Sequence, residues 1–535
     1  MRRWATAIAI GAALLVLYVL RLDDVAGLYV DDAYYIVLAK SLATGQGYAL
    51  ISSAATPILP AFPPGFALLL APIVAVTREF PANMVALKAV SIASMLGVAA
   101  LAYHYLVNYQ AMARERAIAI AALTASLPAF VFLATSTVMA EGAFTLSMLA
   151  SAVTIERAAR DDASRMRNVT LAAVISTGSL LIRSAGIASV FAGALLLTQR
   201  HGWRVAAKFL GIWLLCCAPW VTYAWTHQPT PEQRTAHGGS IVYTYRELLL
   251  MRHGGDPTSG IINAADLVTR VAKNVVNVFG RDVGAVILPA AYRGPSESGQ
   301  EAFQLSGESG MLSGSMGLGT PALVMSCSFS VFVLIGWFAV ARRRCGAAEL
   351  ISMLTVAMVV LVPARTFRYV LPLAPFVLGY FLIGIESVIG FWRGARAGSA
   401  ALRIVAACLV TLVMIEHGQY IAQKFTGPEP PWIEDGHEAR GVTDWINANV
   451  TEGAGIVSTN PGLVYLMTGH PTVALVDPLH NWARWQSADL RYAVALHVAS
   501  TPAPELGYQL RYRSPRLGFW VLDLIPQGTL TESAR

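Results

Sequence analysis

Runs of apolar residues long enough to cross a lipid bilayer alternate along this chain with short polar segments. A membrane-spanning helix needs about 20 predominantly apolar residues. Runs of about that length occur at 4–20, 82–107, 117–134, 138–156, 205–225, 321–341, 347–363, 368–392 and 400–421, with two less regular ones at 62–77 and 169–198. The pattern predicts an α-helical polytopic membrane protein with about 10 to 12 transmembrane helices.

Composition excludes a soluble protein. Hydrophobic residues make up 55% of the 535 positions and charged residues only 13%, whereas soluble domains carry about 25% charged residues. The net charge of +7 does not indicate a nucleic-acid partner, because the arginines stand in short segments that orient a membrane protein. Arg2 and Arg3 precede the first run, which has no small-x-small cleavage site, so we expect a retained helix with its N-terminus inside.

The two irregular runs allow two topologies. In the first, 62–77 spans the membrane and 169–198 is a single helix. In the second, 62–77 is a re-entrant or interfacial segment, and 169–198 forms two arms that meet at Arg183 on the outer side. Both versions place the loops 23–61 and 227–319 outside.

The arginines favour the second topology. In the first, six of them would face outside, against the positive-inside rule. In the second, all six face inside, together with the arginines of the later turns. The six are Arg114, Arg116, Arg157, Arg160, Arg165 and Arg167, and the later ones are Arg200, Arg204, Arg342, Arg343, Arg344, Arg393, Arg396 and Arg403.

The chain divides into two predicted domains. Residues 1–421 form the membrane domain with its outer loops 23–61 and 227–319, and residues 422–535 form a small extracytoplasmic α/β domain. Helix and strand signals alternate in this tail. They are a capped helix start at Thr443, a strand at 455–458, a helix at 461–468 stopped by Gly469, and a strand at 472–476.

Candidate chemistry begins at the acid pair Asp31 and Asp32 in the first outer loop. The apolar spacing over 36–42 predicts a short amphipathic helix on the membrane surface, with both acids at its N-terminus, where the helix dipole stabilises negative charge. Asp31 has two interpretations that spacing does not separate. It is either a helix cap or a general base that deprotonates an acceptor during group transfer.

Other charged residues reach the same depth under the second topology. Glu141, Arg183 and the segment from Arg365 to Arg368 lie near the outer ends of their helices. Ionisable groups at membrane depth usually face a cavity or each other, and an arginine fork suits a phosphate. Structural alternatives remain: Arg183 caps broken helix ends, Arg365 and Arg368 snorkel to the interface, and Glu141 pairs with an arginine.

Six stretches, taken in order, resemble the GT-C superfamily of membrane glycosyltransferases, in particular its bacterial protein O-mannosyltransferases and aminoarabinose transferases. Gly65 departs from the usual bulky residue, and Asp32 replaces the common glutamate. The stretches are Asp31-Asp32 with the aromatic helix that follows, Phe62-Pro63-Pro64-Gly65-Phe66, Met139-Ala140-Glu141-Gly142, Leu181 to Gly186, Arg368 to Pro375, and Asp444 to His470.

The resemblance implies a GT-C-like domain that transfers a sugar from a polyprenyl-phosphate-linked donor. It implies Asp31 as the catalytic base and Asp32 as its support. The acceptor would be an extracytoplasmic protein, lipid or cell-envelope glycan, and the protein would sit among the lipids of the cell inner membrane. The implied substrate-binding residues are Tyr34, Glu141, Arg183, Arg365 and Arg368.

No cofactor or metal is predicted. His227, His237 and His253 stand in the long outer loop, but their spacing matches no compact ligand motif. The alternative function is a membrane transporter or flippase, which usually has paired broken helices near the bilayer midplane. A non-catalytic relative with the same architecture is a third class.

Overall fold

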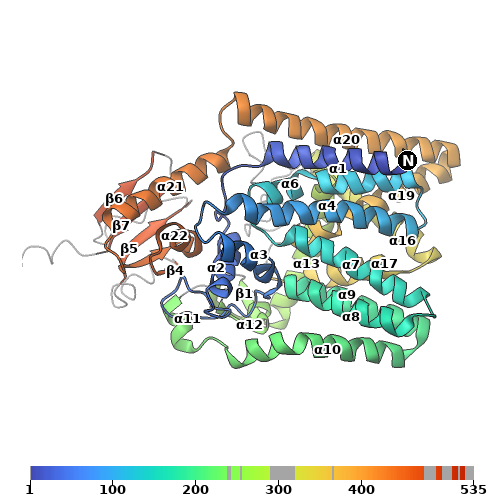
Figure 1. The fold of residues 1–535 in the computed structure, drawn as a ribbon. Coiled ribbons are helices and arrows are strands. Elements are labelled where there is room, and N and C mark those ends of the chain that lie inside the picture. Colours follow the sequence, from blue (N-terminus) through green and yellow to red (C-terminus); the bar gives the residue numbers. More distant parts are fainter. Residues whose placement is uncertain are drawn as a thin grey trace, which may run out of the picture.

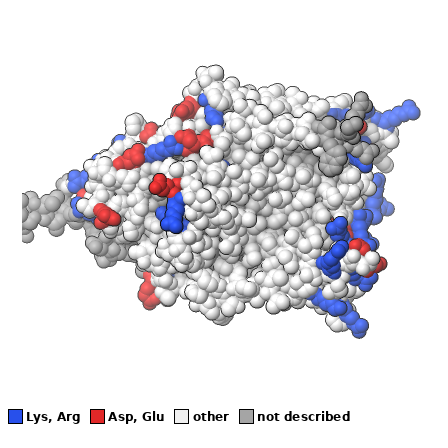
Figure 2. Space-filling model, viewed as in Figure 1, with Lys and Arg blue, Asp and Glu red and all other residues white. Residues whose placement is uncertain are grey.

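The computed structural model describes residues 2–237, 242–253, 256–288, 320–363, 367–474, 490–496, 509–515 and 518–524. Figure 1 shows a bundle of helices lying side by side, with a small α/β domain at one end. We call this end the domain end, and the opposite end, where the N-terminus lies, the basic end. Figure 2 shows lysine and arginine side chains gathered at the basic end.

Apolar helices form the bundle. They are α1 (Arg2–Arg21), α4 (Met84–Asn108), α5 (Arg114–Ser126), α6 (Pro128–Thr135), α7 (Glu141–Arg160), α8 (Arg165–Ile182), α9 (Ile187–His201), α10 (Trp203–Thr226), α16 (Thr320–Arg343), α17 (Ala347–Val359), α19 (Ala374–Arg393) and α20 (Ala395–Thr426). Among the described residues, five helices are long and apolar enough to cross a membrane, or six if the pair α5 and α6, bent by 48°, is one span. Pro128 explains the bend, because it holds the preceding residue out of the helical conformation. The predicted polytopic helical fold is confirmed.

The run 169–198 forms two antiparallel arms, as the second topology predicts. Helix α8 ends at Ile182, Arg183 is extended, and a 3-10 turn from Ser184 to Gly186 (η1) starts the return. At the far end of α9, His201 Nε2 lies 3.1 Å from the carbonyl oxygen of Ala158 in α7. The arm α9 therefore comes back to the basic end, where α8 begins.

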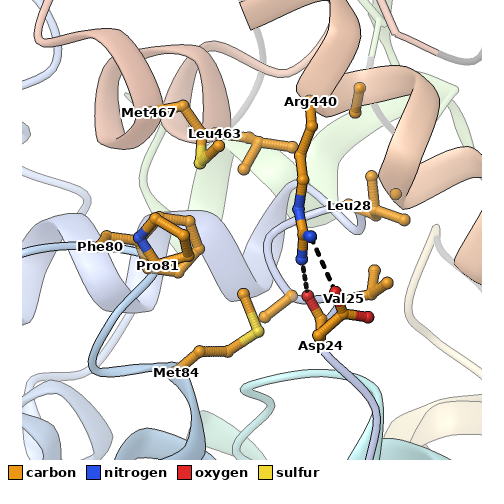
Figure 3. A pocket seen from close by; sticks show the side chains of 12 residues that line it. Asp24, Val25, Leu28, Phe80, Pro81, Met84, Arg440, Leu463 and Met467 are labelled. Carbon is orange, nitrogen blue, oxygen red and sulfur yellow. Dashed lines mark hydrogen bonds and ion pairs between the residues drawn. The ribbon is translucent and has the colours of Figure 1, made fainter. Parts of the chain in front are cut away.

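The run 62–77 does not cross the bundle. Its helix α3 (Gly65–Val76) has 12 residues. Gly65 lies against the turn between α8 and α9, since a Cβ there would be 2.7 Å from the carbonyl oxygen of Leu181. Just beyond the other end, Phe80 and Pro81 face the C-terminal domain in a small pocket (Figure 3). Both ends of α3 thus lie at the domain end, as expected of a re-entrant or interfacial segment.

The acid pair begins helix α2 (Asp31–Ala43), but this helix is not amphipathic. Residues 32–39 and Ser41 are all buried. The predicted helix is present, but its predicted position on the membrane surface, with one face exposed, is wrong. The apolar spacing predicted one buried and one exposed face. In the structure, α3 packs on one part of α2 and the C-terminal helix α22 (Pro461–Thr468) packs on another. The cover comes from segments distant in sequence.

The long outer loop contains structure of its own. Asn274 of α13 anchors it, donating to the carbonyl oxygens of Val360 and Val362 at the end of α17 over 3.1 and 2.8 Å. Residues 289–319 lie outside the described residues. The elements are α11 (Pro231–His237), α12 (Tyr245–Leu250), the antiparallel strands β1 (Met251–His253) and β2 (Asp256–Ile261), α13 (Ala264–Asn277), the π-helical turn η3 (Val278–Asp282) and α14 (Val283–Ile287).

The C-terminal tail folds as the predicted α/β unit. Its five strands have the order β4-β3-β5-β7-β6, with β4, β3 and β5 parallel and the other pairings antiparallel. Thr443 does not start a helix. It lies inside α21, and its hydroxyl bonds back to the carbonyl of Ala439. The elements are α21 (Pro431–Asn449), α22, β3 (Gly455–Ser458), β4 (Thr472–Ala474), β5 (Leu490–Ala495), β6 (Gln509–Arg513) and β7 (Trp520–Asp523).

The tail and the first outer loop share one apolar core. Side chains from α2, α3, α21 and α22 form a single buried cluster, which includes Ile36, Phe66, Val442 and Leu463. Beside it, Arg440 of α21 reaches Asp24, with 2.7 Å between Nη1 and Oδ2 (Figure 3). Partial burial works against the charge of Asp24, but the hydrogen bond and charge of Arg440 outweigh it and lower the pKa of Asp24.

Candidate active site

Four charged side chains from separate elements meet at the domain end. Arg368 lies in α18 (Phe367–Val370), which continues through the 3-10 turn η5 (Leu371–Leu373) into α19. Its Nη1 donates to Oδ2 of Asp31 over 2.7 Å, and its Nε and Nη2 donate to Oε1 of Glu141 over 3.0 and 2.9 Å. Arg183 Nη1 donates to the same oxygen. We call Asp31, Arg368, Glu141 and Arg183 the charged cluster.

Glu141 is the centre of the charged cluster. It is the first residue of α7, where the helix dipole favours a carboxylate, and its side chain is fully buried. Oε1 accepts from both arginines, while Oε2 has no hydrogen-bond partner among the described residues. Glu141 therefore holds two guanidinium groups close together, and its pairing with arginine, expected as a structural alternative, is confirmed.

Arg183 projects from the turn between α8 and α9. Its guanidinium also faces the ring of Tyr369, 5.5 Å from the ring centre. Among the described residues, its side chain makes no hydrogen bond to a helix carbonyl, so the helix-cap alternative is wrong. Apart from the bond to Glu141, its N–H groups remain available to a ligand.

Asp31 is the accessible acid of the charged cluster. Its side chain is 32% exposed, whereas that of Glu141 is fully buried. It starts α2, but no side-chain hydrogen bond caps that helix. One oxygen is held by Arg368, and the carboxylate is reachable from solvent. This combination of fixed position and access suits a group that takes a proton from an acceptor.

Asp32 points away from Asp31 into the protein. Its Oδ2 accepts from the N–H of Gly27 over 2.7 Å, and its Oδ1 accepts from the N–H groups of Tyr29 and Ala33 over 3.0 Å each. Burial raises the pKa of Asp32 to about 6, although these three N–H groups favour the charged form. Asp32 fixes the backbone that carries Asp31, and among the described residues its carboxylate forms no hydrogen bond or ion pair with the arginines of the charged cluster.

Tyr35 is an aromatic residue beside the charged cluster. Its hydroxyl interacts electrostatically with Arg183 and with the other three members of the cluster. Tyr34 interacts with Asp31, but its ring is buried and packs edge-on against Phe62. The role of Tyr34 in substrate binding stays a prediction. Helix spacing could not show which of Tyr34 and Tyr35 faces the charged cluster, because it does not reveal which segments pack on α2.

The long outer loop also reaches the cluster, which sequence reasoning missed. The hydroxyl of Tyr245 in α12 donates to the carbonyl oxygen of Ala61 and interacts with Ser184 beside Arg183. No signal in the sequence connects Tyr245 with the turn at Arg183.

Arg365, the remaining predicted binding residue, lies outside the described residues.

A second buried ion pair, also missed, holds the start of the first outer loop. Lys88 of α4 donates to Oδ1 of Asp23 over 2.9 Å and to its backbone oxygen over 2.8 Å. Ser136 and Trp432 donate to Oδ2 of the same aspartate. The sequence did carry a signal here, because a lysine inside an apolar run is costly unless it is paired.

A metal or cofactor site is not evident in the part of the chain that the structure describes, where no three His, Cys, Asp or Glu side chains gather in a suitable group. Of the loop histidines, His227 stacks on Tyr223 with 4.3 Å between ring centres. The side chains of His237 and His253 lie outside the described residues.

The helical bundle with its α/β tail has the same fold as solved structures of ArnT and of the oligosaccharyltransferase AglB, and this is the fold that the resemblance in the sequence predicted. The structure of ArnT from Cupriavidus metallidurans in the apo state has a TM-score of 0.57 and 12% identity, over 98% of this chain and 99% of that one. The structure of ArnT from the same organism bound to undecaprenyl phosphate gives 0.56 and 13%, over 98% of each chain.

A more distant solved structure has the same fold. The archaeal oligosaccharyltransferase AglB from Archaeoglobus fulgidus, in complex with an inhibitory peptide and a dolichol-phosphate, has a TM-score of 0.52 and 11% identity, over 92% of this chain and 69% of that one. No protein-family model and no curated protein sequence matches the chain.

Proposed function

We propose that this protein is a glycosyltransferase that moves a sugar from a polyprenyl-phosphate-linked donor to an extracytoplasmic acceptor. The observation that carries the proposal is the charged cluster, in which an accessible aspartate and two arginines are held at one end of a GT-C bundle. Solved structures of this fold contain undecaprenyl phosphate in ArnT and a dolichol-phosphate in AglB.

Asp31 acts as the general base. As the acceptor oxygen or nitrogen forms its bond to the anomeric carbon of the sugar, its proton passes to the carboxylate of Asp31. The bond between the anomeric carbon and the phosphate oxygen breaks, and its electron pair leaves with the polyprenyl phosphate. Attack from the face opposite the phosphate would invert the anomeric carbon, and the family resemblance supports this course.

The arginines hold the phosphate. Arg183 spends one N–H group on Glu141 and offers the others to phosphate oxygens. Arg368 bridges Asp31 and Glu141, so it keeps the base in place and adds positive charge beside the departing phosphate. Glu141 remains buried behind both guanidinium groups and sets their spacing.

The site faces the extracytoplasmic side. The arginines of the basic end, seen in Figure 2, belong inside by the positive-inside rule. The charged cluster lies at the opposite end of the bundle, beside the C-terminal domain. We expect the acceptor to reach Asp31 from outside, between the first outer loop and the long loop.

The decisive variant is Asp31→Asn, which keeps the size of the side chain but removes its basicity. We expect the rate of transfer from a polyprenyl-phosphate-linked sugar to fall at least about a hundredfold. The dissociation constant of the donor should stay within about twofold of that of the unmodified protein, and the thermal stability should be retained. The matched control is Asp162→Asn at the basic end, which is 71% exposed and should leave the rate unchanged. An unchanged rate in Asp31→Asn would rule out the assignment.

The same assay separates an enzyme from a transporter. Purified protein in detergent has no sealed compartments, so transport cannot be scored there, but a transferase still forms product. Product formation that depends on Asp31 supports the proposal. Movement of lipid-linked sugar across vesicles without any product, for a broad set of acceptors, would replace it with a flippase.

A further inference from the structure

A large cavity lies at the basic end, opposite the charged cluster. It has a volume of about 1190 Å³ and is enclosed by α5, α16, α19 and α20 together with the loop after α4. Ligand pockets for small molecules have volumes of about 300 to 1,000 Å³. This space is therefore sufficient for a ligand larger than most metabolites, and the proposed transfer reaction does not use it.

The walls of the basic-end cavity change character with depth. Towards the middle of the bundle they are apolar, with Leu382 and Ile383 on α19 and Ala406 on α20. Towards the end of the bundle they carry arginines from three helices, which are Arg116, Arg343, Arg344 and Arg403. A cavity that is apolar at depth and cationic at its mouth matches an amphipathic anion.

Most of the acids in the cavity wall are already paired. Glu386 accepts both ends of the Arg116 fork over 2.6 and 2.8 Å, and Ser399 donates to it over 2.8 Å. Glu156 accepts from Arg160 and from the N–H of Ala347. These carboxylates are therefore not available to neutralise further cations.

Glu349 is satisfied in the same way. It accepts from the N–H of Gly346 over 2.8 Å, from Tyr380 over 2.9 Å and from Gln110 over 3.1 Å. Glu115, exposed at the rim, is the remaining acid of the wall.

Two arginines of the wall lack a carboxylate partner. Among the described residues, neither Arg343 nor Arg403 is within 4.0 Å of an acid, and both are exposed. Arg344 makes only a long contact of 3.5 Å to Glu156, which already pairs with Arg160. The mouth thus presents three exposed arginines, Arg343, Arg344 and Arg403, beside one exposed acid of the wall, Glu115, and arginine forks bind phosphate oxygens well.

We infer that the basic-end cavity binds an anionic glycerophospholipid from the surrounding leaflet. Its phosphodiester lies between Arg343 and Arg403, and an acyl chain runs along Ala406 and Leu382 into the bundle. Basic pockets between transmembrane helices are a known way to recognise anionic headgroups. The inference rests on this cavity and does not depend on the role of Asp31.

Native mass spectrometry of the full-length protein tests the inference. After delipidation, the protein is mixed with phosphatidylglycerol, phosphatidylcholine or a polyprenyl phosphate, and the retained lipid is measured. We expect phosphatidylglycerol to be retained over phosphatidylcholine. The double variant Arg343→Gln with Arg403→Gln should weaken retention about tenfold or more, because it removes both charge-assisted contacts to the phosphodiester.

The matched control is Arg342→Gln with Arg396→Gln, which removes the same charge at the same end from residues outside the cavity wall. It should retain phosphatidylglycerol like the unmodified protein. A second variant, Ala406→Phe, fills the apolar part and should reduce retention without changing any charge. Equal losses in both double variants, equal retention of phosphatidylcholine, or preferential retention of polyprenyl phosphate would each overturn the inference.

Discussion

Arg368 contacts two carboxylates at once, and this requires a guanidinium fork. Its Nη1 reaches Asp31 while Nε and Nη2 reach Glu141. A lysine ammonium is a point charge and cannot maintain both contacts in the same geometry. Arg368→Lys should therefore lower kcat about ten- to a hundredfold, measured by initial rates at saturating donor.

The control for this change is Arg116→Lys. Arg116 forms an equally bidentate pair with Glu386, but at the basic end. Its replacement should leave kcat unchanged. If both variants lose activity to the same degree, the loss at Arg368 reflects general weakening of the bundle and not the position of the base.

The pH dependence of activity should carry the signature of Asp32. Its pKa of about 6 lies above the ordinary value of 3.8 because of burial, so its charged form costs stability. The folded protein is therefore more stable at a pH below the ordinary pKa, where Asp32 is protonated, and it loses this stability as the pH rises through about 6. Activity should respond in the opposite direction, because a protonated Asp32 presents an O–H group to backbone N–H donors and loosens the loop of Asp31.

We expect the transfer rate to fall as the pH drops through about 6, with no parallel loss of thermal stability from this group. The measurement is a rate profile between about pH 5 and about pH 8, run beside thermal unfolding. Asp32→Asn, which cannot titrate, should be slower overall and should lack this acid limb. A profile that is flat in that interval for the unmodified protein contradicts the role given to Asp32.

At the residue scale, the sequence predicted the charged residues best. Asp31, Glu141, Arg183 and Arg368 stand out because charge at membrane depth is costly, and orienting the helices brings them to one level. The direction of a side chain is a different matter. Spacing alone could not show that Asp32 turns inwards to Gly27, since its partners depend on a loop conformation with no regular repeat.

At the element scale, α22 of the tail braces the helix that carries Asp31. Asn460, which precedes α22, donates from Nδ2 to the carbonyl oxygen of Gly27 over 2.6 Å, and the N–H of Gly27 donates to Asp32. Gly27 has φ +87, and a Cβ there would be 2.8 Å from Leu463. The backbone conformation thus favours glycine at position 27, and any larger residue there would also displace the side chain of Leu463.

Removing this brace should slow catalysis without removing the site. Asn460→Ala deletes the bond to Gly27 and one hydrogen bond at the start of α22, so we expect about a five- to tenfold lower kcat with donor affinity retained. Steady-state kinetics with varied donor separate the two effects. Asn449→Ala, on the exposed end of α21, is the control and should behave like the unmodified protein. A loss of donor affinity with unchanged kcat would contradict the brace.

Most elements were predictable where the pattern was local. The helix of the first outer loop, the strand at 455–458 and the helix stopped by Gly469 follow from apolar spacing and a left-handed glycine. The burial of α2 was not predictable in this way, because α22 covers it from more than 400 positions away. The helix predicted to start at Thr443 begins 12 residues earlier, at Pro431, because a proline in the first turn is compatible with a helix.

At the scale of the whole molecule, the two topologies differ in the position of Arg78. This residue is exposed just after α3. If α3 crossed the membrane, Arg78 would lie inside and Arg167 outside, whereas the structure, oriented by the positive-inside rule, places Arg78 at the outer domain end and Arg167 at the inner basic end. With the five natural cysteines changed to serine, Arg78→Cys should react with an impermeant thiol reagent from outside in intact cells, and Arg167→Cys only after lysis. The reverse pattern, in which Arg167→Cys reacts from outside and Arg78→Cys only after lysis, would establish the first topology and contradict the one described here.

The contact between Asn460 and Gly27 also sets an order for biosynthesis. The two residues are 433 positions apart, and chains grow at about 5 to 20 residues per second, so Gly27 leaves the ribosome roughly 20 to 90 s before its partner. The bundle can insert during that interval, but the loop of Asp31 still lacks its support. We therefore expect the loop of Asp31 to reach its final conformation only after α22 has been made, and a chain arrested before α22 to insert in the membrane without that support.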